Sequence, residues 1–209
     1  MRNNEFGRSM IEMLGVLAIV GILSIGGIAG YSKAMTKYKM TRLIGQVSEI
    51  VINIRTLYIN QKSLEGLTIN SLVNSNVFPH GMVQENSQND YSIIHAFGGT
   101  VSVFPSLDND NSIRAFEIYI NDINNESCMT LASMDWGQEV ASGFIGMYLG
   151  TVPIATAQMY NIKSGDDSNP SSGIYTPGLH DNSVPLSIMN AQTGCSCTGV
   201  TCSVGLKYM

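Results

Sequence analysis

The sequence is poor in charged residues and lacks the motifs around which many catalytic sites are built. Asp, Glu, Lys and Arg make up 13% of its 209 residues, whereas a soluble domain usually carries about 25%. The formal net charge of −5 argues against a nucleic-acid-binding domain, which is usually basic. The sequence contains no G-x-S-x-G, H-E-x-x-H or Walker motif. The missing motifs give little support to catalysis, and the low content of charged residues favours a chain that is partly buried in a membrane or another protein rather than only in itself.

Histidines and acidic runs are too sparse to indicate a cofactor or a metal site. His80, His95 and His180 stand apart in the sequence, and we interpret them as surface or core residues. The acidic segments 108–111 and 166–167 lack the Gly and the distal Glu of an EF-hand loop, so a turn and a solvated loop are predicted there. We expect no catalytic residue, no metal and no cofactor.

Proline is absent before Pro79, so nothing in the sequence interrupts a helix from Ser9 to Tyr58. Residues 9–31 form an apolar run in which Glu12 is the only charged residue. About 20 apolar residues cross a ~30 Å hydrocarbon core as a helix, and a secretory signal peptide has a shorter apolar core. The run is therefore predicted to insert in a membrane. A carboxylate in hydrocarbon is costly unless it finds a partner or reaches the headgroups, which makes Glu12 a candidate functional residue.

The helix is predicted to continue as an amphipathic segment over residues 32–58. Its apolar residues recur at spacings of three and four, which place them on one face: Met40, Leu43, Val47, Ile50, Ile54 and Leu57. We expect this segment to pack on a globular head formed by residues 61–209.

The segment GRSMIE, residues 7–12, resembles the processing site of type IV pilins and pseudopilins. In that family a short polar leader ends in Gly, a prepilin peptidase cleaves after it, and the mature chain begins with an apolar helix whose fifth residue is Glu. The resemblance implies a leader over residues 1–7, cleavage between Gly7 and Arg8, and a long N-terminal helix over 8–60 with Glu12 as its fifth residue. Arg8 stands where the family usually has a methylated hydrophobic residue, so methylation of Arg8 is left open.

The resemblance also implies a role for Glu12 and a set of partners. Cleavage creates an α-ammonium group about one helical turn before Glu12, and the amine of a neighbouring subunit would neutralise the carboxylate and set the register between helices. Such a buried pair contributes mainly specificity, because desolvation offsets much of the Coulomb attraction. The implied partners are copies of the same chain in a helical homopolymer, the prepilin peptidase, inner-membrane assembly machinery, and the membrane before assembly. The implied location is the inner membrane of a bacterium and then an extracellular pilus, while binding of nucleic acid is left open.

The head is predicted to have an α+β fold, in which the long helix packs on an antiparallel β-sheet. The expected elements are a short helix within 67–78, two β-runs at 101–104 and 115–120 around a turn at 108–111, a helix beginning near Cys128 after cap residues 124–126, a surface loop at 164–173, and two strands within 195–209.

Four cysteines, Cys128, Cys195, Cys197 and Cys202, are expected to be oxidised if the head lies outside the cytoplasm. A bond between Cys195 and Cys197 has poor geometry, whereas Cys197 and Cys202 flank a four-residue turn. The preferred pairing is Cys128–Cys195 with Cys197–Cys202, and Cys128–Cys197 with Cys195–Cys202 stays open as the alternative. The spacing C-x-C-x4-C is unlike that of common structural zinc sites. Many larger type IVb pilins clamp the carboxyl-terminal part of the head with a disulfide from an internal cysteine. This chain resembles that pattern, with Cys128 as the internal cysteine.

The leading interpretation is a structural subunit of a type IV pilus, closer to the type IVb group. The alternatives are a pseudopilin of a type II secretion system, a minor pilin, and, in a different class, a single-pass membrane enzyme or receptor in which Glu12 is accidental. The presence of Glu12 favours a shaft subunit, because tip subunits of the family often lack this residue. Nothing in the sequence indicates what such a filament would adhere to.

Overall fold

The computed structural model of the chain contains two compact units, Met1–Thr41 and Arg42–Met209. The residues that the structure describes are 5–87, 90–137, 142–151, 156–163, 165, 173–177, 184–197 and 201–209, with side chains described from residue 10 onward.

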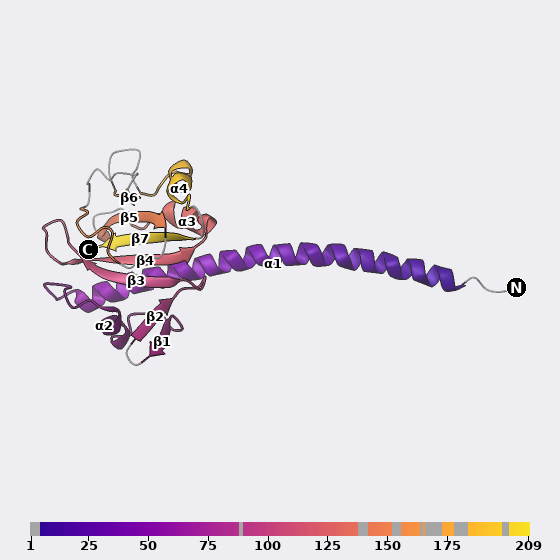
Figure 1. Cartoon of the computed structure of the whole chain (residues 1–209), viewed down its shortest axis with the longest axis horizontal. Helices are drawn as coiled ribbons and strands as arrows, with labels where there is room; N and C mark the ends of the chain where they lie inside the picture. The colour runs from indigo at the N-terminus through magenta and orange to yellow at the C-terminus, as the bar shows by residue number, and fades with distance from the viewer. Residues whose placement is uncertain are drawn as a thin grey trace. The chain divides into compact units, whose positions relative to one another are not determined.

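Helix α1 extends without interruption from Glu5 to Tyr58, over 54 residues (Figure 1). The continuous helix predicted from Ser9 to Tyr58 is therefore confirmed. Because no proline lies within it, every internal backbone N–H remains available for the helical hydrogen bonds. The residues of α1 up to Thr41 belong to the first unit and those from Arg42 belong to the second.

Within the second unit, α1 buries one face in the head. Four residues of the predicted apolar face are fully buried: Leu43, Val47, Ile50 and Ile54. Leu57 was predicted to continue this face but is 39% exposed, so the buried face ends about one turn before the helix does. Side chains on the flanks attach α1 to the head: Gln46 accepts the N–H of Ala96 at 3.1 Å, and Asn53 donates to the carbonyl of Val77 at 2.8 Å.

Among the described residues of the second unit, seven antiparallel strands form one sheet in the spatial order β1-β2-β3-β4-β7-β5-β6 (Figure 1). The strands are β1 (Val83–Ser87), β2 (Asp90–Ile94), β3 (Thr100–Ser106), β4 (Ala115–Ile123), β5 (Phe144–Thr151), β6 (Ile174–Tyr175) and β7 (Cys202–Tyr208). The last strand of the chain, β7, lies between β4 and β5. The helix and the antiparallel sheet together form the α+β fold that the sequence predicted.

Strands β3 and β4 confirm the two predicted β-runs and the turn between them. They pair from Val101 opposite Ile120 to Ser106 opposite Ala115. In the turn, Asn111 has a φ of 60°, a left-handed conformation that Asn tolerates better than most residues. The Asp/Asn-rich composition of this segment thus matches the backbone that it must adopt.

Strand β4 is buried on both faces of the sheet. Because side chains alternate along a strand, Phe116 and Ile118 share one face, while Glu117, Tyr119 and Asn121 share the other, and all five are buried. The head therefore covers both faces of the central strand, and one of the covered faces carries polar groups.

Three short helices begin after capping side chains: α2 (Ile69–Asn74) after Thr68, α3 (Asn125–Ala132) after Asn124, and α4 (Ile188–Gly194) after Ser187. Helices α2 and α3 lie where the sequence predicted helices.

The tail differs from its prediction, because residues 195–197 do not form the first of the two expected strands. The Ser187 side chain accepts the N–H of Asn190 at 3.3 Å and starts α4, and Cys195 is the C-cap residue of that helix. Ser196 and Cys197, which follow this C-cap, lie outside any strand. The predicted loop at 164–173 lies largely outside the described residues, with only positions 165 and 173 within them.

Candidate functional site

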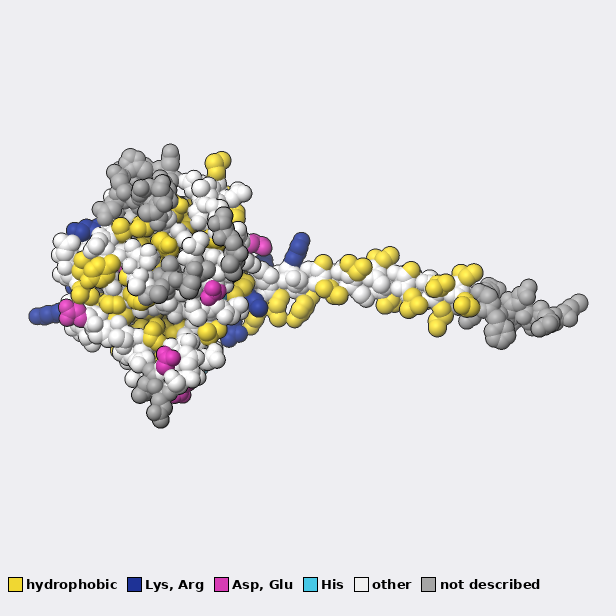
Figure 2. All heavy atoms as spheres, viewed as in Figure 1, with side chains coloured by type: hydrophobic (Ala, Val, Ile, Leu, Met, Phe, Trp, Pro, Cys, Tyr) yellow, Lys and Arg dark blue, Asp and Glu magenta, His cyan; other side chains and the backbone are white. Residues whose placement is uncertain are grey.

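The apolar segment of α1 in the first unit is not covered by its own unit. Every side chain from Met10 to Tyr31 is exposed, and the large apolar ones expose between 52% (Val20) and 73% (Ile25) of their surface. An 18-residue window of this helix has a mean hydropathy of 2.2, and none of it is buried. Figure 2 shows hydrophobic side chains along both visible edges of the segment. Contiguous apolar surface of this extent marks contact with a membrane or with other protein chains.

Glu12 lies within this uncovered apolar segment. Its side chain is exposed, and it follows Arg8 by four residues, which is about one helical turn. The backbone of Gly7 and Arg8 is helical, while their side chains lie outside the described residues. The structure thus places Glu12 on the apolar helix, and cleavage between Gly7 and Arg8 stays a prediction from the sequence.

Two disulfide bonds join the four cysteines in the head. Cys128 of α3 is bonded to Cys195 at the end of α4, with 5.8 Å between the Cα atoms. Cys197 is bonded to Cys202, the first residue of β7, with 5.5 Å between the Cα atoms. Of the two pairings that the sequence left open, the structure contains the preferred one. The first bond fixes α4 beside α3 across 67 positions of sequence, and the second closes a loop of only 5 positions.

A buried lysine fastens a loop to the polar face of the sheet. Lys207 of β7 lies opposite Glu117 of β4, and both side chains are fully buried. The Nζ of Lys207 donates to the carbonyls of Met159 at 2.7 Å, Tyr160 at 3.1 Å and Ile162 at 2.7 Å. A buried ammonium group is tolerated only when it has such partners. Lys207 therefore holds the segment 156–163 on this face.

Glu117 makes complementary contacts with the same loop. Its carboxylate accepts hydrogen bonds from the Ser106 hydroxyl at 2.7 Å, from the N–H of Met159 at 3.0 Å, and from the Tyr119 hydroxyl. Burial, followed by the charge of Glu117, raises the pKa of Tyr119, which keeps its hydroxyl protonated as a donor. This cluster was not predicted, although a glutamate and a lysine inside apolar strands are a sequence signal that could have revealed it.

His95 is a core residue in its neutral form. The N–H of Phe97 donates to Nδ1 at 3.2 Å, so Nε2 carries the proton and donates to the carbonyl of Asn121 at 2.7 Å. Burial lowers the pKa of His95, against a smaller opposite effect of the Asn121 carbonyl. His80 is exposed, and His180 lies outside the described residues. The two described histidines thus have the core and surface roles that the sequence predicted.

The Asp108 carboxylate is satisfied by donors within the β3–β4 turn. Its Oδ1 accepts the N–H groups of Asp110 at 2.8 Å and Ser112 at 2.9 Å, and Arg114 pairs with Oδ2. Burial by itself would raise the pKa of Asp108, but the backbone donors and the Arg114 guanidinium outweigh it and lower the pKa. The contacts of this carboxylate are those of a turn. The second acidic segment, 166–167, lies outside the described residues.

Several known proteins are similar to this chain. The family model described as PilS N terminal matches residues 37–201. The major structural subunit of the bundle-forming pilus of Escherichia coli O127:H6 (strain E2348/69 / EPEC) is 28% identical over 133 residues, which cover 64% of this chain and 66% of that protein. The subunit of the same name from Escherichia coli O111:H- matches with the same identity and coverage. The match thus spans slightly less than two thirds of the length of these relatives.

The fold has a relative among the solved structures. The crystal structure of TcpA, a type IV pilin from the Vibrio cholerae El Tor biotype, matches with a TM-score of 0.56 and 14% identity, covering 82% of this chain and 99% of that one. At this identity the likeness concerns the fold. Because the family model covers most of the chain, the chain belongs to the PilS N-terminal family, and its fold is that of the type IV pilins.

Proposed function

We propose that this chain is a structural subunit of a type IV pilus, of the type IVb kind, and has no enzymatic activity. The observation that carries the proposal is the uncovered apolar segment of α1 between Met10 and Tyr31. Lipid would cover this surface before assembly, and the same segment of other copies would cover it in a filament. The relatives from Escherichia coli are major structural subunits of a pilus, which favours a pilus subunit over a pseudopilin of a type II secretion system.

The buried ionisable groups of the head make structural hydrogen bonds, which supports a structural role for the chain. Glu117 and Lys207 hold a loop on the sheet, Asp108 anchors a turn, and neutral His95 bridges two backbone groups. Groups that general acid–base chemistry would use are thereby engaged in the fold.

The subunit is proposed to be processed by a prepilin peptidase between Gly7 and Arg8, so that residues 1–7 are a leader and the mature chain begins with the helix of residues 8–60. The proposal rests on the spacing between Gly7 and Glu12. Insertion in the inner membrane would precede processing, and assembly machinery in that membrane would then transfer the subunit to an extracellular pilus.

Glu12 is proposed to set the axial register between subunits. An α-ammonium group at residue 8 would lie about one turn from the Glu12 carboxylate along its own helix, and the corresponding amine of a neighbouring copy would be the partner in the filament. A pair of this kind in an apolar core supplies specificity of register more than stability.

The two disulfides are proposed to form outside the cytoplasm and to clamp the head that the filament displays. Disulfide bonds of this kind require an oxidising compartment, because thiols in the cytosol are kept reduced. Free thiols at Cys128 and Cys195 in the exported protein would contradict both parts of this proposal.

Filament composition tests the proposed function directly. Surface filaments are sheared from cells that make the chain, imaged, and analysed by mass spectrometry. We expect this chain as the main component, and we expect filaments to disappear when it is deleted. Filaments that persist after deletion and lack the chain would contradict the proposal.

Intact mass of the membrane-bound and sheared protein tests the processing step. We expect a mature chain beginning at Arg8, and we expect Gly7→Val to retain residues 1–7. Gly15→Ala is a matched control, because a Cβ at Gly15 meets no described atom within 4 Å, and it should be processed normally. A sheared filament made of chains that retain residues 1–7 would exclude the proposed cleavage.

A further inference from the structure

Helix α4 presents two large apolar side chains to solvent. Ile188 is 75% exposed and Met189 is 76% exposed, and we refer to this pair as the α4 ridge. No Asp, Glu, Lys or Arg occurs between residues 182 and 206, so a partner could cover this part of the surface without desolvating a charge from it. Large exposed apolar side chains on a segment that has no charged residue of its own are typical of a contact site.

The α4 ridge is held in a fixed position. The N–H of Leu186 donates to the carbonyl of Ala132 at 3.0 Å, Ser187 caps the start of α4, and the bond from Cys195 to Cys128 fixes its end. The backbone of such an element loses little freedom when a partner binds, which favours its use as an anchor.

An acidic side chain accompanies the α4 ridge. Glu126, in the first turn of α3, lines the same groove between α3 and α4 as Ile188. It is exposed and makes no ion pair within the part of the chain that the structure describes. The contact site therefore consists of two apolar side chains with one negative charge beside them.

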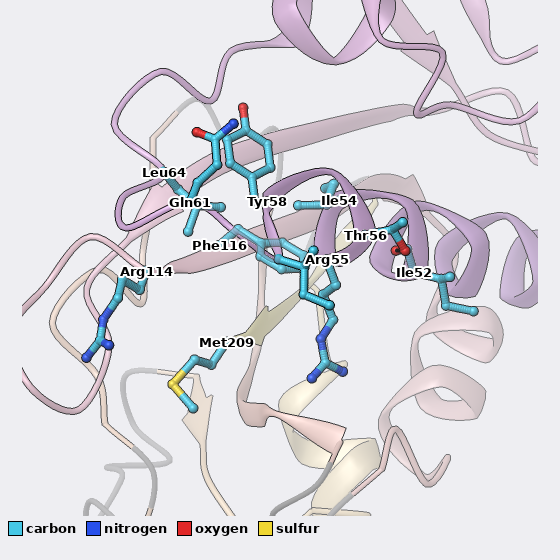
Figure 3. Close-up of a pocket in the computed structure, with 11 residues that line it drawn as sticks. Ile52, Ile54, Arg55, Thr56, Tyr58, Gln61, Leu64, Arg114, Phe116 and Met209 are labelled. Atoms are coloured by element: carbon cyan, nitrogen blue, oxygen red, sulfur yellow. Dashed lines mark hydrogen bonds between the residues drawn. The ribbon is translucent and has the colours of Figure 1, made fainter.

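A second apolar surface, which we call the α1-end pocket, lies elsewhere on the head. This cavity of about 440 Å³ is formed where α1 ends and the carboxyl-terminal residue lies (Figure 3). Its apolar lining includes Ile52, Ile59 and Met209, which are 62%, 77% and 48% exposed. Arg55 lines the same pocket and contributes positive charge to it, whereas Arg114, which also lines it, is ion-paired with Asp108 and Asp110.

The two surfaces are complementary in polarity and charge. The α4 ridge offers apolar side chains beside the acidic Glu126, and the α1-end pocket offers an apolar hollow beside the basic Arg55. Arg55 is exposed, and its guanidinium donates to the carbonyl of Ser142 at 2.6 Å, a neutral acceptor that leaves its charge uncompensated by that contact.

We infer that the α4 ridge of one copy of the chain docks in the α1-end pocket of a second copy, with Glu126 facing Arg55. The ridge and the pocket are different surfaces of one chain, so the contact is heterologous and each copy retains a free ridge at one side and a free pocket at the other. Repetition of such a contact produces an open helical array. This inference rests on the proposed filament function, and it identifies which parts of the heads touch.

Crosslinking in filaments tests the contact. The double variant Met189→Cys with Ile59→Cys is produced in cells, filaments are sheared and mildly oxidised, and the chains are separated without reductant. We expect a ladder of covalent multimers, because each copy carries both partners. The control pair Met189→Cys with Val83→Cys places the second thiol on β1, where Val83 is 40% exposed, and should give no ladder. Filaments without a ladder, or the same ladder from the control, would overturn the inference while leaving the filament function intact.

If the cysteine variant does not assemble, the contact is tested instead by exchanging the charges at positions 126 and 55. Glu126→Arg and Arg55→Glu each place like charges opposite one another, and each should lower the yield of sheared filaments by about tenfold. The combined variant restores opposite charges and should recover most of the yield. A combined variant no better than the single ones would overturn the contact, whereas a wild-type chain absent from filaments would contradict the proposed function instead.

Discussion

The two units of this chain treat apolar and charged side chains in opposite ways. In the first unit, every side chain from Met10 to Tyr31 is exposed although nearly all are apolar, and in the head even Glu117 and Lys207 are fully buried. A helix with uncovered apolar surface depends on lipid or on other chains for its cover. A head with satisfied buried charges carries its stability within itself. Changes to the apolar segment of the first unit should therefore affect assembly, and changes to buried side chains of the head should affect folding.

The largest effect is expected from Glu12→Ala. The substitution removes a charge from the apolar segment, so the amount of membrane-bound chain should stay normal or rise. In a filament it would leave the neighbouring amine buried without a partner, and the yield of sheared filaments should fall by at least about a hundredfold. Both fractions are quantified in the same cells, with Glu49→Ala on exposed surface of α1 as the control. A normal filament yield from Glu12→Ala would show that assembly does not require the Glu12 carboxylate.

The long-range disulfide should dominate the stability of the head. Replacing Cys128 and Cys195 by Ser should lower the free energy of unfolding by about 4 kcal/mol, whereas replacing Cys197 and Cys202 should lower it by about 2 kcal/mol, because the loops differ in length. Unfolding of the detergent-solubilised chain is followed by the fluorescence of Trp136, the single tryptophan, which is 8% exposed. Equal losses from the two pairs would contradict the loop-length argument.

The next largest effect on the stability of the head is expected from replacing the buried Lys207. Lys207→Met deprives three carbonyl groups of their donor and should lower the free energy of unfolding by about 3 kcal/mol. Lys62→Met, at an exposed position, is the control and should change it by less than about 0.5 kcal/mol. If both variants unfold at the same denaturant concentration, the hydrogen bonds of Lys207 do not hold the loop of residues 156–163.

The smallest effect concerns the pH dependence of the head. Burial lowers the pKa of His95 in the folded chain, so protonation favours the unfolded state. The contribution of neutral His95 is complete above the ordinary histidine pKa of about 6.5 and is lost as the pH falls below it. Denaturant unfolding between pH 7.5 and 5 should show this decline in the wild type and in His80→Gln, and a weaker decline in His95→Gln. The same slope in all three chains would show that His95 is not its source.

Local sequence patterns predicted much of the fold. The pairings between segments that lie far apart in the sequence could not be predicted from such patterns. The absence of proline and the spacing of three and four gave α1 and its buried face, and the Asp/Asn turn gave β3 and β4. Strands β1, β2, β5 and β6 were missed. Strand β1 is exposed along its whole length and shows no apolar alternation, β5 pairs with β7 across more than fifty positions of sequence, and β6 contains only two residues. Helix α4 was not predicted, although Ser187 and Gly194 have the residue types that begin and end a helix.

The sequence by itself determined the apolar segment of α1, the position of Glu12 within it and its spacing from Gly7, because hydropathy and helical periodicity are properties of neighbouring residues. The sequence also reduced the possible disulfide pairings of the four cysteines to two. Only the tertiary structure decided between them, since it places α4 beside α3 and brings Cys195 to Cys128. It alone also revealed that Glu117 and Lys207 are buried partners of one loop and that α4 has an uncovered ridge. Burial and pairing of these groups depend on contacts between segments far apart in the chain, which no local pattern encodes.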